Sequence, residues 1–89
     1  MRSELVYKAK IQITFKNGVL DPQGSAVKQA LHHLGFVSVK DVRIGRLVEI
    51  LISSQTPLDA ENQIKQMCEQ LLANPVIEEY RVLSLEEIE

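Results

Sequence analysis

The segment Leu5–Phe15 restricts the possible fold more than any other stretch, because apolar and polar side chains alternate along it. The residues on one side of the alternation are apolar: Leu5, Tyr7, Ala9, Ile11, Ile13 and Phe15. Those on the other side are polar: Lys8, Lys10, Gln12, Thr14 and Lys16. Successive side chains of a strand point to opposite faces, so this period of two predicts a β-strand with one buried face.

Two later segments have the apolar spacing of amphipathic helices. Val27, Ala30, Leu31 and Leu34 form one stripe on a predicted helix over 22–34. A second helix is predicted to begin at Thr56-Pro57 and to stop before Asn74-Pro75. Both begin with a capping side chain followed by proline, whose fixed φ suits the first helical position.

Three further segments are predicted to be strands: 36–44, 47–53 and 76–83. A phase slip at Lys40-Asp41 suggests a bulge or bend in the first of them. Gly45-Arg46 is interpreted as a tight turn, so that 36–53 forms a β-hairpin. Segment 47–53 is almost wholly apolar, which favours a central strand that is covered on both faces, or on one face by another subunit.

The resulting order, β-α-β-β-α-β, is typical of a ferredoxin-like α+β sandwich, an antiparallel sheet with two helices on one face. That arrangement places the first and third strands in the centre. Residues 1–84 are expected to form a single domain, and 85–89 an acidic C-terminal tail.

The second face of the predicted sheet has a composition that is unfavourable when exposed to water. It carries the Lys8, Lys10, Gln12 and Thr14 row and, from the third strand, Leu47, Glu49 and Leu51. We therefore expect the chain to be oligomeric, with another copy covering this face or pairing with an edge strand.

Composition excludes several classes of function. The chain has 89 residues, of which 45% are hydrophobic and 25% charged, and these values are ordinary for one globular domain. A net charge of −2 argues against nucleic-acid binding, which normally needs a basic excess. No apolar run approaches the length of a membrane span, and the N-terminal residues do not resemble a signal peptide. The single cysteine fits a reducing cytoplasm.

The residues that could carry catalysis or bind metal do not form a recognisable constellation. His32 and His33 are neighbours on a helix, about 100° apart, so they cannot both ligate one ion. Cys68 lies on an apolar helical stripe, where a buried and unreactive thiol is the usual case. Glu78 and Glu79 are neighbours on a strand and point to opposite faces. We expect no catalytic, cofactor-binding or metal-binding residue.

Loop 17–24 is predicted to join the first strand to the first helix. Asn17-Gly18 suits a turn, and Asp21 can accept hydrogen bonds from the first free N–H groups of the helix. Gly24 has no side chain, which could let another backbone approach closely. Arg43, Arg46 and Glu49 cluster near the predicted hairpin turn, where charges are usually solvent-facing but could anchor a partner.

Two runs of residues resemble the PurS family, the small subunit of phosphoribosylformylglycinamidine (FGAM) synthase. They are Gly18-Val-Leu-Asp-Pro-Gln-Gly24 and Leu71-Leu-Ala-Asn-Pro-Val-Ile-Glu-Glu-Tyr80, with Val42-Arg-Ile-Gly-Arg46 between them. The likeness extends from the first strand to Tyr80. It departs from the family at Arg46, where Lys is usual, and at Glu79, where Asp is frequent; both changes preserve charge.

The resemblance implies a non-catalytic subunit that forms a dimer or tetramer in the cytoplasm. It implies assembly with a glutaminase subunit and a large synthetase subunit, which use glutamine, ATP and Mg²⁺. The complex would convert formylglycinamide ribonucleotide (FGAR) to FGAM in purine biosynthesis, with this chain bridging the two enzymes and assisting ammonia transfer. An ACT-like regulatory module that binds a small molecule is the alternative, because it has the same order of elements.

The family motifs contain residues that helix and strand formation alone would not demand. We take these as candidate contacts with the larger subunits: Asp21, Pro22, Gln23, Gly24, Arg43, Gly45, Arg46, Asn74, Glu78 and Tyr80.

Overall fold

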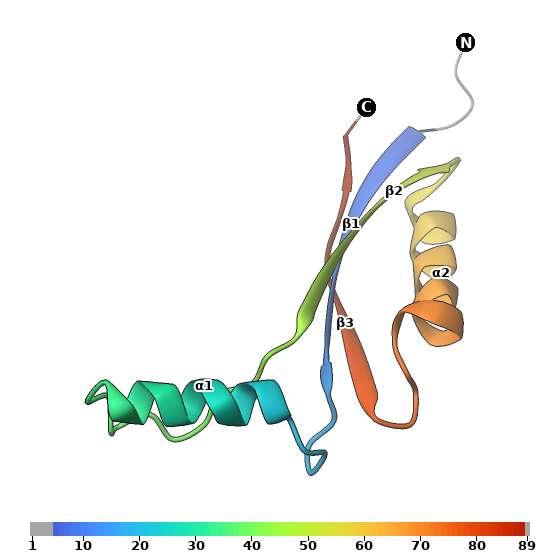
Figure 1. The fold of residues 1–89 in the computed structure, drawn as a ribbon. Helices are drawn as coiled ribbons and strands as arrows, with labels where there is room; N and C mark the ends of the chain where they lie inside the picture. Colours follow the sequence, from blue (N-terminus) through green and yellow to red (C-terminus); the bar gives the residue numbers. More distant parts are fainter. Residues whose placement is uncertain (1–4, 89) are drawn as a thin grey trace.

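A three-stranded antiparallel sheet forms the body of the molecule in the computed structural model, which describes residues 5–88. The strands are β1 (Leu5–Phe15), β2 (Arg46–Ser54) and β3 (Glu78–Glu87), in the order β2-β1-β3. The central strand β1 pairs with both neighbours, for example Tyr7 with Ile52 and with Glu87 (Figure 1). The period-two segment of the sequence is therefore the strand on which the sheet is built.

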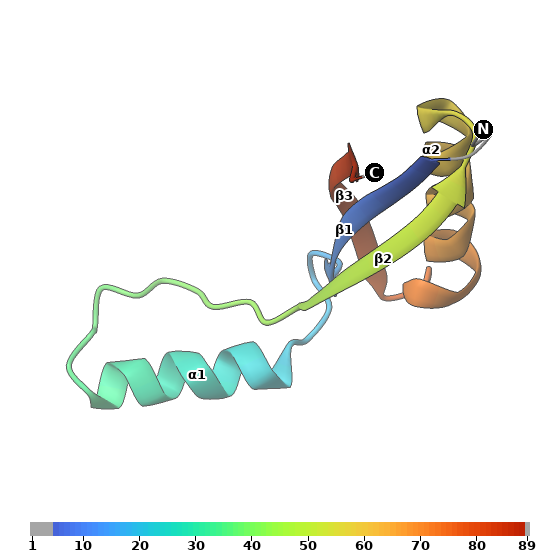
Figure 2. The same cartoon turned by 90° about the horizontal axis from the view of Figure 1, so that it is seen from above.

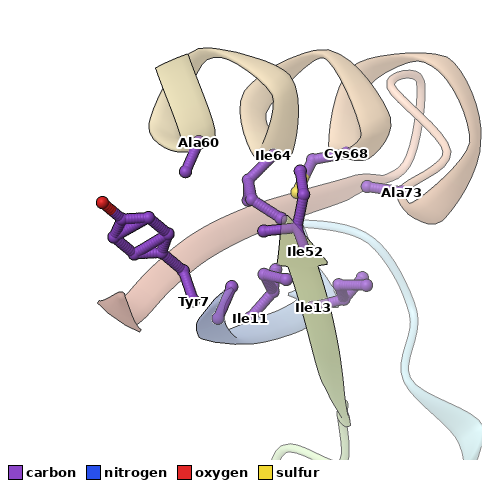
Figure 3. Close-up of a cluster of buried hydrophobic side chains, with 9 residues drawn as sticks. Tyr7, Ile11, Ile13, Ile52, Ala60, Ile64, Cys68 and Ala73 are labelled. Carbon is purple, nitrogen blue, oxygen red and sulfur yellow. The ribbon is translucent and has the colours of Figure 1, made fainter. Parts of the chain in front are cut away.

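Helix α2 (Pro57–Met67) and a π-helical turn, η1 (Cys68–Leu72), cover one face of this sheet. The apolar row of β1 faces them, and Tyr7, Ala9, Ile11 and Ile13 are each at most 2% exposed. Figure 3 shows the other side of the contact, where Ile64 and Cys68 project toward the sheet beside Ile52. The predicted buried face of the first strand is thus confirmed.

Helix α1 (Pro22–His33) does not join this core. Together with the segments on either side it forms a projection, residues 16–45, which we call the arm (Figures 1 and 2). The Cα radius of gyration is 17.3 Å, whereas a compact chain of this length has about 12 Å. The apolar stripe of α1 consequently faces solvent in the single chain, with Leu34 73% exposed.

The predicted α+β class is confirmed, with an antiparallel sheet and two helices consistent with a ferredoxin-like fold, but the prediction of a fourth strand over 36–44 is wrong. This segment returns along α1 without strand pairing (Figure 2). After Gly35, which has φ +100°, the chain reverses, and His32 Nε2 lies 2.9 Å from the Val39 carbonyl oxygen. The reversal keeps the segment beside the helix, away from the sheet.

Two consequences of the predicted hairpin are also wrong. Without a strand over 36–44 there is no 36–53 hairpin, and β2 lies at an edge of the sheet, not at its centre. Only α2, not both helices, packs on the sheet face. The apolar character of β2 instead leaves Leu47 and Leu51 59% and 65% exposed on the second face, near the Lys8–Glu49 ion pair.

The C-terminal segment is more ordered than a tail. Strand β3 continues to Glu87, Leu85 packs against the core, and the Ile88 amide donates to the Val6 carbonyl at 2.9 Å. The expected acidic tail, 85–89, therefore begins inside a strand, and Glu89 lies outside the described residues.

We predict that Ile64→Ala lowers the free energy of unfolding by about 2–4 kcal/mol, because it leaves a cavity in the core. Ile64 is 1% exposed between α2 and β1. Urea denaturation measures the loss. The matched control is Leu58→Ala on the same helix, where the side chain is 66% exposed and the expected change is within about 0.5 kcal/mol. Equal losses in the two variants would contradict this packing.

Candidate partner interface

The structure gathers most of the predicted interface residues into two neighbouring hydrogen-bond networks. The arm-base network contains Asn17, Asp21, Gly24, Arg43 and Ile44, where the arm leaves and rejoins the sheet. The β3-entry network contains Arg46, Leu72, Asn74 and Glu78, where the chain passes from η1 into β3. Tyr80 lies next to the second network.

Asp21 is the centre of the arm-base network. Its Oδ1 accepts from the Gly24 amide at 2.9 Å and caps α1, as predicted. Its Oδ2 accepts from the Ile44 amide at 2.8 Å, a bond across 23 positions of sequence. These two amides, Gly24 first, hold the pKa of the Asp21 carboxyl below its ordinary value because they stabilise the ionised form. One carboxylate thus fastens both ends of the arm together.

Two glycines permit the close backbone approach at this point. A Cβ atom on Gly24 would collide with the Val42 carbonyl oxygen, and one on Gly45 would collide with that of Ile13. The prediction that another backbone lies close to Gly24 is therefore confirmed. Arg43 contributes through its Nη1, which donates to Asn17 Oδ1 at 3.0 Å.

The β3-entry network is organised by Glu78 and Arg46. Arg46 Nη2 lies 3.1 Å from both Glu78 carboxylate oxygens and also donates to the Leu72 carbonyl. Glu78 Oε1 accepts a hydrogen bond from the backbone N–H of Asn74 at 2.7 Å. The Arg46 side chain is 57% exposed, so this ion pair adds only about 0–1 kcal/mol of stability in water. Its main consequence is to fix the loop 73–77 against the start of β2.

Tyr80 and Cys68 lie beside this network and are not activated. The Tyr80 hydroxyl donates to Glu69 Oε2 at 3.0 Å. Burial, and then the Glu69 carboxylate, raises the pKa of Tyr80. Burial likewise raises the pKa of the Cys68 thiol, whose residue is fully buried. The interpretation of Cys68 as a buried, unreactive core thiol agrees with this position.

Lys16 precedes the arm-base network in the chain and binds the loop 73–77, and the sequence did not mark it as a candidate. Its Nζ donates to the Pro75 carbonyl at 2.7 Å, and its amide donates to the Ile77 carbonyl at 2.9 Å. Asn17, the acceptor for Arg43, was considered only as a turn residue. A long-range signal would have been needed to find either one, because each partner lies at least 26 positions away.

The remaining candidates, Pro22 and Gln23, are exposed at the start of α1. His33 is exposed, whereas His32 contacts the returning segment of the arm. Among residues 5–88, no group of three or more His, Cys, Asp or Glu side chains is placed to hold a metal ion. No helix in the same residues is long and apolar enough to cross a membrane.

These features define a small α+β protein with a helical arm that projects from an antiparallel sheet. The family profile described as PurS, phosphoribosylformylglycinamidine (FGAM) synthase, matches residues 8–86. The chain therefore belongs to the PurS family.

Two curated relatives match the sequence of this chain over most or all of their own length. The chain is 50% identical over 76 residues to the PurS subunit of phosphoribosylformylglycinamidine synthase from Bacillus subtilis, covering 85% of this chain and 89% of that one. It is 38% identical over 84 residues to the subunit from Methanocaldococcus jannaschii, covering 94% and 100%.

Solved structures show the same fold. Thermus thermophilus PurS is 43% identical and superposes with a TM-score of 0.84 over 94% of this chain and 99% of that one. A chain of the Thermotoga maritima PurLQS structure is 29% identical, with a TM-score of 0.79 over 93% and 98%. Such coverage leaves too few residues unmatched to omit the arm, so the projecting arm belongs to the shared fold.

We predict that the base of the arm loosens only below the ordinary pKa of the Asp21 carboxyl group, 3.8. Asp21 has a lowered pKa, so its bonds to the Gly24 and Ile44 amides are complete above its ordinary pKa of 3.8 and are lost as the pH falls through the lowered value. The chemical shifts of these two amides, followed by NMR from pH 7 downward, should titrate with a midpoint below 3.8.

Asp21→Asn should abolish this titration, because the variant has no carboxyl group at that position. Asp41→Asn removes a nearby carboxylate that accepts no hydrogen bond within the described residues, and it should leave the titration unchanged. A midpoint at or above the ordinary value would show that Asp21 does not hold the arm as described.

Proposed function

We propose that the chain is the PurS subunit of a phosphoribosylformylglycinamidine synthase in the cytoplasm. In this complex FGAR, glutamine and ATP give FGAM, glutamate, ADP and phosphate, a step of purine biosynthesis. The match to a PurLQS chain is the observation that carries the proposal. We infer that the chain itself performs no chemistry and that ATP, Mg²⁺ and glutamine bind to the partner subunits.

The proposed task is to bridge a glutaminase subunit and a large synthetase subunit and to assist ammonia transfer between them. Ammonia released into water at neutral pH is protonated and lost as a nucleophile, so exclusion of water from its path matters. A bridge needs surfaces of fixed shape. The two networks supply them, because they hold the arm and the 73–77 loop to the sheet at adjoining places.

The far end of the arm is a second surface, which we propose mediates self-association as a dimer or tetramer. Large apolar side chains at the far end of the arm are exposed in the single chain: Leu34 (73%), Phe36 (57%) and Val37 (76%). Contiguous exposed apolar surface is characteristic of interaction sites. We infer that another copy of the chain covers this part of the arm. This contact is separate from the cover that we expect over the second face of the sheet.

The ACT-like regulatory module is not favoured. It was suggested by the order of elements and by the 17–24 loop, whereas the curated relatives are synthase subunits. A ligand-specific rise in melting temperature with an amino acid, in the absence of any partner subunit, would return it to consideration.

We predict that the chain assembles with the matching glutaminase and synthetase subunits when ADP and glutamine are present. Light scattering of the mixture should give a particle larger than any pair of components, and glutamine-dependent FGAM formation should require this chain. Failure of both measurements with active partners would overturn the proposed function.

Arg43→Ala should reduce co-purification with the partner subunits by roughly three- to tenfold, as expected for loss of an interface arginine. The variant also loses the hydrogen bond to Asn17, so Asn17→Ala is the matched control: it breaks the same bond and keeps the guanidinium group. Equal behaviour of the two variants would assign Arg43 to the internal structure of the arm only.

Phe36→Glu should shift the chain toward smaller species in sedimentation velocity, because it places a charge in the proposed apolar contact. Gln29→Glu adds the same charge at an exposed position of α1 and should leave the distribution unchanged. A distribution that is identical for Phe36→Glu and wild type would exclude the end of the arm from the self-association surface.

A further inference from the structure

A polar cleft of about 320 Å³ lies at the base of the arm, beside the arm-base network. The turn 17–21 forms one wall, α1 a second, and the returning residues 41–43 a third. Six charged or amide side chains line it: Lys16, Asn17, Asp21, Lys28, Asp41 and Arg43. The proposed role in assembly assigns no ligand to this cleft.

Three of these side chains are cations that form no direct ion pair, although the charge of Arg43 contributes to the lowered pKa of Asp21. In residues 5–88 the ion pairs are Lys8–Glu49 and Arg46–Glu78, so none involves Lys16, Lys28 or Arg43. Lys28 is half-buried and makes no hydrogen bond within the same residues. Like charges that share a cleft repel one another, and an anion bound between them would relieve that repulsion.

The two carboxylates of the cleft, Asp21 and Asp41, offset two of the three positive charges, so one positive charge remains in excess. Both oxygens of Asp21 already accept backbone amides, Oδ1 from Gly24 and Oδ2 from Ile44. Asp41 is exposed, lies in no ion pair of the described chain and accepts no hydrogen bond there. Its oxygens remain available to accept a hydrogen bond from a hydroxyl group of a ligand.

Two cation donors retain unused hydrogens. Arg43 donates one hydrogen bond, to Asn17, from a group with five N–H donors, and Lys16 donates one, to Pro75, from a group with three. The Asn17 contact holds the guanidinium group at the rim of the cleft. Lys28 is uncommitted. The cleft therefore combines fixed positive charge with spare donors.

We propose that this cleft binds a small phosphate monoester, such as a pentose phosphate. The phosphate group accepts hydrogen bonds from Arg43, Lys16 and Lys28. The Asp41 carboxylate accepts a hydrogen bond from a hydroxyl group of the attached sugar. A phosphate monoester carries nearly two negative charges at pH 7 and three acceptor oxygens, which suits three cations better than a single carboxylate does. The cleft volume lies at the lower end of the range for small-molecule sites.

Titration of the full chain with ribose 5-phosphate at constant ionic strength, followed by amide chemical shifts, tests the proposal. We expect saturable shifts confined to the cleft, at Gly18, Ser25 and Val42, and none with ribose. Lys28→Ala should weaken binding by about tenfold, the usual effect of losing one charged hydrogen bond. Lys28→Arg keeps the charge and should retain binding within about threefold of the wild type.

Lys65→Ala is the matched control, since it removes a lysine from a helix on the other side of the molecule. It should bind as the wild type does. The proposal is overturned by the absence of saturable shifts, by shifts away from the cleft, by equal binding of ribose, or by equal loss in Lys28→Ala and Lys65→Ala. Assembly with the partner subunits is measured separately, so failure here leaves the proposed function standing.

Discussion

The pairing of β1 with β2 constrains everything that lies between them in the sequence. The two strands are antiparallel neighbours, with Ile13 opposite Arg46, so the arm must leave the sheet and return to it at almost the same place. The arm is in effect a long hairpin connection that contains a helix. Asp21 closes it by binding the Gly24 and Ile44 amides, and Gly24 and Gly45 allow the backbones to meet. The orientation of α1 follows from this closure and owes little to packing, because its apolar stripe touches no core.

The local parts of the fold could be predicted from the sequence, but the pairing of its strands could not. Three predictions depended on neighbouring residues only: the alternation over Leu5–Phe15 and the helix starts at Asp21-Pro22 and Thr56-Pro57. All three were confirmed. Segment 36–44 has residues suited to a strand, yet a strand forms only where a second one supplies hydrogen bonds. Here Gly35 reverses the chain along α1 and no such partner is near. For the same reason, the apolar character of β2 could not distinguish a central strand from an edge strand.

The candidate site shows the same division between local and distant interactions. Asp21 as a helix cap follows from its place before Pro22, whereas its second bond, to Ile44, depends on the return of the arm. Arg46 and Glu78 were both candidates, but nothing in their spacing indicated that they contact each other. Lys16 was missed because it appears in sequence as the last polar residue of the β1 alternation. Several motif residues thus have a role within the chain that is sufficient to explain their presence, and the partner contact that we propose for them is a separate role.

The separation of the arm from the core has an energetic consequence. Burial of apolar surface contributes about 25 cal/mol per Å², and in this chain that gain comes from β1, β2, β3 and α2. Leu34 and Val37 gain little from folding, since they remain 73% and 76% exposed. Their burial energy is therefore still available when the arm meets another chain. The closed base fixes the direction in which they are presented, which lowers the entropy lost on association. A rigid base and an unburied end are thus complementary features for the assembly that we propose.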